Sequence, residues 1–244
     1  MIGGVRALLM LTLAGCGRIG FGTTNDPADG PANSDAIGPL GDAPASAITV
    51  TFGERSDAMF TGVSKDTHLA QAQPTLNFGG AIELDLDGPP TADNLLILFD
   101  TTAIPVNATV FSASLDLMIT DTASAEARLQ AFRMLRDWNE GSSNGVGGAA
   151  SWQQPTLAEL WEEAGAGGSE RDTTVVADVM GPFILNTPIT IALLPDAVQR
   201  WVADKTTNFG LVVTQINGTD GTGFGSREEP RESFRPLLTV TYVP

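Results

Sequence analysis

The stretch that decides the fold lies near the end of the chain, where residues 208–213 read NFGLVV, residues 224–228 read FGSRE and residues 235–242 read RPLLTVTY. The first and last of these runs are rich in Val, Leu, Thr and Tyr, which suit a half-buried strand. Asn217-Gly218 and Asp220-Gly221 lie between them and are turn dipeptides. The stretch therefore predicts short strands flanking a polar, Gly-rich loop, and we expect the last strand to pair inside a sheet.

The same sequence pattern extends upstream to residue 48: short apolar runs, or runs that alternate apolar and polar residues, are separated by turn signals. Residues 82–86 alternate apolar and charged side chains, whereas residues 95–100 are almost continuously apolar, which favours a central buried strand. The other expected strands are residues 48–53, 67–72, 108–120, 127–136, 173–179 and 189–194. Many short strands with little helix predict an all-β fold, an antiparallel β-sandwich or jelly roll.

Two segments carry helical signals. In residues 156–164, apolar side chains recur at i, i+3, i+4 and i+7 with glutamates opposite, so this segment is predicted to be a short helical insertion. Residues 196–203 predict one or two helical turns that point Val198, Trp201 and Val202 inward.

The first residues predict a lipoprotein signal peptide, residues 1–16. A positive charge at Arg6 precedes an apolar run that is too short to span a bilayer. Small residues then precede Cys16, the only cysteine of the chain, as in a bacterial lipobox, so Cys16 is the predicted lipidation site. Several acyl chains would anchor the protein stably in a membrane. The alternative is an ordinary signal peptide with an incidental cysteine.

Residues 17–47 are rich in Gly, Pro, Ala, Ser, Asn and Asp and hold too little apolar surface to offset the entropy of folding. They predict a disordered acidic tether with a reach of roughly 30 Å. The folded domain is then expected over residues 48–244.

Charge narrows the classes of partner. The chain has 13 Lys and Arg against 29 Asp and Glu, a net charge of −16, so its surface repels phosphate backbones and nucleic acid is not expected as a partner. A single cysteine excludes an intramolecular disulfide.

Taken together, a series of short motifs resembles the DNRLRE-type domain family, which is grouped with carbohydrate-binding modules and related to the disaggregatase repeats. The motifs are NFG at 77–79, LILFD at 96–100, IP at 104–105, ATV at 108–110, ASL at 113–115, DWNE at 137–140, SW at 151–152, VQRW at 198–201, NFGL at 208–211, SRE at 226–228 and RPL at 235–237. The chain departs from the family pattern at Ser151, at Phe209 and in the helical character of residues 156–164. The resemblance implies a jelly-roll sandwich, placement outside the cell and, in some members, polysaccharide binding.

The chain offers few candidates for a catalytic acid, base or nucleophile, because it has one His, one Cys and one Tyr. His clusters for a metal hydrolase are excluded by count. Glu228 and Glu229 are neighbours and would point to opposite faces of a strand, so they do not form an obvious carboxylate pair. No catalytic residue is assigned, and the protein is not expected to be an enzyme.

The predicted ligand edge is Arg133 or Arg136 with Trp161 beside it. The strand over residues 127–136 has two mostly apolar faces with one guanidinium each, and a rim arginine on an acidic protein is where an anionic sugar is best tolerated. Trp138, Trp152 and Trp201 are expected in the core. Arg227 and Arg235 are expected to make pairs inside the fold.

No metal site is assigned, because no compact calcium loop is present. A structural calcium held by aspartates such as Asp57, Asp66 and Asp100 is left open, and no other cofactor is expected.

The sequence thus favours a lipid-anchored protein of the bacterial cell envelope whose sandwich binds a cell-surface or external polysaccharide without catalysis. The residue after Cys16 is not the Asp associated with inner-membrane retention, which favours the outer membrane or cell surface. The second hypothesis is a structural or adhesive surface protein without a sugar site. The third is a polysaccharide-degrading enzyme.

Overall fold

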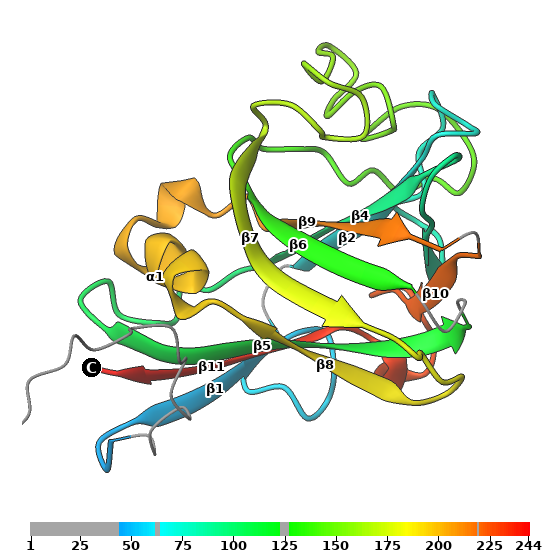
Figure 1. The fold of residues 1–244 in the computed structure, drawn as a ribbon. Helices are drawn as coiled ribbons and strands as arrows, with labels where there is room; N and C mark the ends of the chain where they lie inside the picture. Colours follow the sequence, from blue (N-terminus) through cyan, green and yellow to red (C-terminus); the bar gives the residue numbers. More distant parts are fainter. Residues whose placement is uncertain (1–43, 62–63, 123–126, 219) are drawn as a thin grey trace, which may run out of the picture. The chain divides into compact units, whose positions relative to one another are not determined.

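The computed structural model describes residues 44–61, 64–122, 127–218 and 220–244 (Figure 1). Cys16, the predicted signal peptide and most of the predicted tether lie outside these residues. The described chain is an all-β sandwich of two antiparallel sheets with one α-helix, as predicted. None of its helices has the length and apolar character needed to cross a membrane.

The first sheet contains the strand that the end of the sequence predicts. Its strands lie in the order β1 (Ile48–Phe52), β11 (Leu237–Val243), β5 (Thr109–Asp121), β10 (Thr222–Gly225) and β3 (Glu83–Leu86), and β8 (Pro188–Leu193) also pairs with β5. Because β11 pairs with both β1 and β5, the prediction that this strand lies inside a sheet is confirmed.

The second sheet has five strands in the order β2 (Ser64–Ala70), β4 (Asp93–Phe99), β9 (Leu211–Asn217), β6 (Arg128–Met134) and β7 (Arg171–Met180). Figure 1 shows the two sheets as stacked layers, with α1 (Pro195–Ala203) at one end between them. The main core joins residues of both sheets, such as Leu115 and Leu117 of β5 with Leu95 and Ile97 of β4.

A second core covers the outer face of the five-stranded sheet. Leu96 of β4 and Phe132 and Met134 of β6 meet Trp138 and Trp161 there, beneath the long connection between β6 and β7. Strands β4 and β6 therefore bury both faces, which explains why residues 95–100 read as a continuous apolar run.

Two of the three tryptophans expected in the core are fully buried: Trp138 is 1% exposed and Trp201 is 2% exposed. Trp152 is only partly buried and packs against the second core from outside.

The helix predicted over residues 156–164 is wrong. This segment consists of turns and an isolated bridge between Thr156 and Glu159. Of its apolar side chains, Trp161 is 5% exposed, whereas Leu157 and Leu160 are 73% and 68% exposed. The segment therefore buries one large side chain and not the apolar face of a helix. The helical insertion of the sandwich is instead α1, in which Val198, Trp201 and Val202 point inward as predicted.

Candidate functional site

A cavity of about 410 Å³ lies where α1 meets the second sheet. It is lined by residues that follow one another in two short segments: Arg133 and Leu135 from the end of β6, and Arg200, Ala203, Asp204, Thr207 and Phe209 from the last turn of α1 onward. It combines mostly apolar walls with convergent polar groups, which makes it the first candidate for a ligand.

The helix that forms one wall is fixed to both sheets. Pro195 starts α1 at a position where a missing N–H costs nothing. The Gln199 side chain accepts a hydrogen bond from the Val110 backbone N–H at 2.7 Å and donates to the Ala108 carbonyl at 3.1 Å, which ties α1 to β5. The Leu194 N–H donates to the Val176 carbonyl of β7. The cavity wall therefore belongs to the rigid scaffold.

The segment after α1 is fixed in the same way. Lys205 Nζ donates to the carbonyls of Thr101 and Ile104 at 2.9 and 2.8 Å. Asp204 caps the short 3₁₀ helix Lys205–Thr207 by accepting from the Thr206 N–H. This carboxylate is thus already engaged, although it lies on the cavity rim.

Arg133 supplies the buried charge of the site. Its side chain comes from the inner face of β6, which it shares with Leu129 and Ala131, and the residue is only 7% exposed. One N–H, at Nη2, donates to Asp172 Oδ2 at 2.9 Å. A guanidinium carries five N–H donors. The other four N–H groups of Arg133 have no protein acceptor among the described residues and remain available at the cavity.

Asp172 neutralises the charge of Arg133 and occupies one of its N–H donors. The pKa of Asp172 lies below its ordinary value, first because its carboxylate accepts the Thr174 N–H and next because Arg133 donates to it. Asp172 therefore stays ionised at neutral pH and continues to accept the Arg133 N–H.

Arg200 adds a second guanidinium, from the exposed face of α1. It pairs with Asp196 one turn earlier, Nε to Oδ2 at 3.0 Å, in contact with solvent. Exposed pairs of this kind contribute little, so Arg200 can turn to a ligand at small cost. Phe209 lies half-buried on the same cavity and offers an apolar surface. Two guanidinium groups beside an aromatic ring suit a small anionic ligand with C–H groups, such as an acidic sugar.

The structure does not assemble the ligand edge in the predicted form. Arg133 faces the main core side of β6, whereas Arg136 and Trp161 lie on the outer side with the second core. Trp161 is 5% exposed and its indole N–H donates to the Ser151 carbonyl at 2.8 Å, because its ring is an anchor of the second core. It is not among the residues that line the cavity.

Arg136 lies close to this anchor but is already paired. Its guanidinium meets Glu159 at 2.7 Å and Glu170 at 3.6 Å, and it donates to the Leu160 carbonyl at 3.3 Å. Of the predicted ligand residues, Arg133 alone lines the cavity.

Sequence reasoning missed Arg200 and Phe209 as cavity residues. Both stand in quoted motifs, VQRW and NFGL, so a signal was present, but the motifs do not reveal that the two residues meet Arg133. The expectation for Arg227 and Arg235 is confirmed: Arg227 pairs with Glu228 at 2.9 Å, and Arg235 donates to the carbonyls of Glu229 and Glu54.

A second hollow, of about 200 Å³, has the opposite charge. Its acidic lining residues are Asp85, Asp87, Asp93, Asp121 and Asp220, and no Lys or Arg is among the described residues that line it. Burial, reinforced by neighbouring carboxylates, raises the pKa of Asp85 and of Asp93 to about 6. An anion is repelled here, so the arginine-lined cavity is the favoured site for one.

No known family model matches the chain. A search of curated proteins likewise found no match.

Proposed function

We propose that this protein is a lipid-anchored envelope protein whose sandwich binds an acidic polysaccharide, with one sugar carboxylate in the cavity between Arg133 and Arg200. The proposal is carried by one observation: Arg133, which is 7% exposed, donates one hydrogen bond to Asp172 and lines a cavity of about 410 Å³ with its remaining donors free. Burying a charge is costly unless its hydrogen bonds are satisfied, so free donors at such a place favour an anionic partner.

The shape and composition of the cavity favour a sugar over a simple ion. The volume accommodates a sugar unit, and Leu135 and Phe209 give it apolar walls beside the two arginines. A sugar carboxylate would meet the guanidinium groups while its C–H faces pack on these walls.

Binding rather than hydrolysis is favoured by the same residues. Glycoside hydrolysis uses two carboxyl groups flanking the scissile bond. Among the described residues that line this cavity, Asp204 is the only carboxylate, and it accepts hydrogen bonds from Thr206 N and Oγ1. The resemblance to a family with carbohydrate-binding members agrees with this proposal.

The test is a glycan array followed by calorimetry with the acidic oligosaccharide that binds best. Arg200→Ala is the main variant, because the side chain is exposed and its loss leaves no buried group unpaired. We expect affinity to fall at least about tenfold, the scale for a charge-assisted hydrogen bond, and to weaken as salt rises. Arg133→Gln is the second variant and should lose binding more completely.

The matched control is Arg128→Ala. Arg128 is also on β6 and also pairs with an aspartate, Asp178, at 2.6 Å, but it does not line the cavity. The proposal fails if both cavity variants bind as tightly as the control. An array on which no acidic glycan binds would favour the structural surface protein instead.

A further inference from the structure

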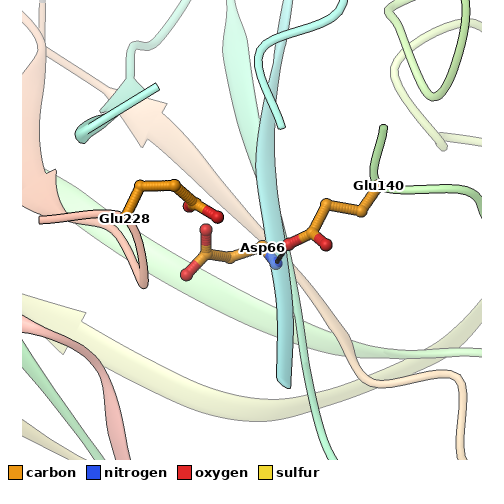
Figure 2. A group of neighbouring side chains, drawn as sticks. All are labelled: Asp66, Glu140 and Glu228. Atoms are coloured by element: carbon orange, nitrogen blue, oxygen red, sulfur yellow. Dashed lines mark hydrogen bonds between the residues drawn. The ribbon is translucent and has the colours of Figure 1, made fainter. Parts of the chain in front are cut away.

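Three carboxylates from distant parts of the chain lie close together at the β2 edge of the second sheet. Asp66 lies on β2, Glu140 follows β6 and Glu228 follows β10. Figure 2 shows the Glu228 carboxylate directed at that of Asp66, with the Glu140 carboxylate on the other side of Asp66. One oxygen from each residue lies within 4.8 Å of the other two.

The fold holds these groups in place through backbone contacts. The Asp66 N–H donates to Glu140 Oε1 at 2.7 Å, and the Arg227 N–H donates to Asp66 Oδ2 at 2.8 Å. The buried Asn77 side chain donates to the Glu140 carbonyl at 2.7 Å. Gly79 packs so closely on this carbonyl that a Cβ would lie 2.0 Å from its oxygen. The positions of the carboxylates are therefore set by the scaffold.

Two oxygens of the cluster lack a partner. Asp66 is 2% exposed, and its Oδ1 has no hydrogen-bond donor among the described residues. Glu228 Oε2 is also buried without a donor there. Buried acceptors without partners are rare in folded proteins, because each one loses its water without replacement.

The cluster also carries unbalanced negative charge. The Arg227 guanidinium meets Glu54 at 2.5 Å, Glu140 at 2.8 Å and Glu228 at 2.9 Å, while Asp66 accepts the Arg227 backbone N–H. Four carboxylates therefore lie around a single arginine. The nearby Lys65 pairs with Asp137 instead. Burial is the largest cause that raises the pKa of Asp66, Glu140 and Glu228 above their ordinary values, and mutual repulsion adds to it.

We propose that this cluster binds a divalent cation, Ca²⁺, through Asp66, Glu140 and Glu228. Carboxylate oxygens are the ligands of a hard cation, and Ca²⁺ accepts them in irregular geometry at about 2.3–2.6 Å, with water completing its shell. Oxygens that lie within 4.8 Å of one another can all bind one such ion. The ion satisfies the free oxygens of Asp66 and Glu228 and offsets the excess charge. The site is discontinuous in sequence and joins β2, the β6–β7 connection and the segment after β10.

The experiment treats the full chain with EDTA, removes the chelator and titrates CaCl₂ by calorimetry, with MgCl₂ in parallel. We expect one Ca²⁺ per chain, weaker Mg²⁺ binding, and a melting temperature that rises with CaCl₂ because the ion binds only the folded state. Asp66→Asn and Glu228→Gln keep the shape of the side chains and should each weaken Ca²⁺ at least about tenfold. Asp57→Asn is the matched control, since Asp57 is an exposed aspartate paired with Arg55.

Terbium gives a readout of location. Trp138 is two residues before Glu140, so excitation of tryptophan should sensitise Tb³⁺ bound at the cluster, and CaCl₂ should quench that emission by competition.

Two results would overturn the proposal. One is a parent protein that shows neither heat nor a change in melting temperature up to about 10 mM CaCl₂, beyond the weak end of protein calcium sites. The other is unchanged Ca²⁺ affinity in Glu228→Gln, which decides the matter even if Asp66→Asn does not fold.

Discussion

The indole N–H of Trp138 donates a hydrogen bond to the backbone carbonyl of Phe209 at 3.0 Å. This bond joins the start of the β6–β7 connection to the residue that forms an apolar wall of the arginine-lined cavity. Phe209 is followed by Gly210, whose φ of +79° suits glycine and whose Cβ position would lie 2.1 Å from the Ile97 carbonyl. The cavity wall is thus held from two sides, by the Trp138 indole and by the close approach of Gly210 to Ile97.

Trp138 and Trp201 should respond differently to the same substitution. Both are almost fully buried, but Trp201 Nε1 has no acceptor among the described residues, whereas Trp138 Nε1 has Phe209. Trp138→Phe leaves a buried carbonyl unpaired, which adds about 1–3 kcal/mol to the cost of lost volume. Trp201→Phe removes a donor that was already unsatisfied, so it should cost less. Urea unfolding of both variants measures the difference.

Each Trp→Ala variant should cost about 3–5 kcal/mol, because a large cavity remains. Equal costs for the two Trp→Phe variants would contradict the role assigned to the Phe209 carbonyl.

His68 makes stability depend on pH. It is 3% exposed, stacks on Phe78 with ring centroids 4.2 Å apart, and accepts the Asp85 N–H at Nδ1. Burial lowers its pKa from 6.5 to about 4. Because the unfolded state binds the proton first, this group stabilises the fold fully above pH 6.5. Its contribution is lost as pH falls toward 4, by about 3 kcal/mol in total.

His68 is the only histidine, so its proton NMR signal can be followed without assignment ambiguity. The raised pKa values of Asp85 and Asp93 act in the opposite direction between about 4 and 6, since the folded state binds those protons first. The comparison is therefore made with His68→Gln, whose unfolding free energy should fall less between pH 7 and 4.5. A histidine that titrates near 6.5 in the folded protein would refute this account.

The proposed membrane anchor is tested at Cys16. Cys16→Ser should abolish acylation and leave the protein soluble or unprocessed, because the thiol is the acceptor of the lipid. Detergent partitioning and mass spectrometry of the N-terminal peptide measure this. Membrane partitioning that survives the substitution would rule out the lipoprotein proposal.

The strands could be predicted from the sequence because side chains that face the core recur at every second residue of a strand. Leu115, Leu117 and Ile119 alternate along β5 and all face the main core. Helix α1 was readable for a similar reason, since Val198, Trp201 and Val202 recur at helical spacing after Pro195.

The same spacing misled over residues 156–164, because tertiary contacts outweighed it. The Trp161 N–H donates to the Gln153 carbonyl at 3.0 Å and its indole to Ser151, while the Glu162 N–H donates to the Glu170 carboxylate. These bonds are incompatible with a regular helix, and the sequence pattern of residues 156–164 does not predict them.

The sites were only partly readable. Arg133 stood out because a charged side chain interrupts an apolar face, a signal within one strand. Its partner Arg200 is 67 residues away, by their numbering, and their meeting depends on how α1 docks. Of Asp57, Asp66 and Asp100, the structure brings only Asp66 into a carboxylate cluster, and its companions Glu140 and Glu228 come from unrelated motifs.

The register of β1 against β11 places Ile48, the first residue of β1, opposite Tyr242, the penultimate residue of β11. The polypeptide therefore enters and leaves the sandwich at neighbouring points, about 5 Å apart as paired strands are. Such a domain can be spliced into a surface loop of an unrelated host, or have its ends joined and be opened elsewhere, without any of its ladders being cut. The sandwich is therefore suited to insertion into a host protein at a loop whose two ends lie about one strand spacing apart.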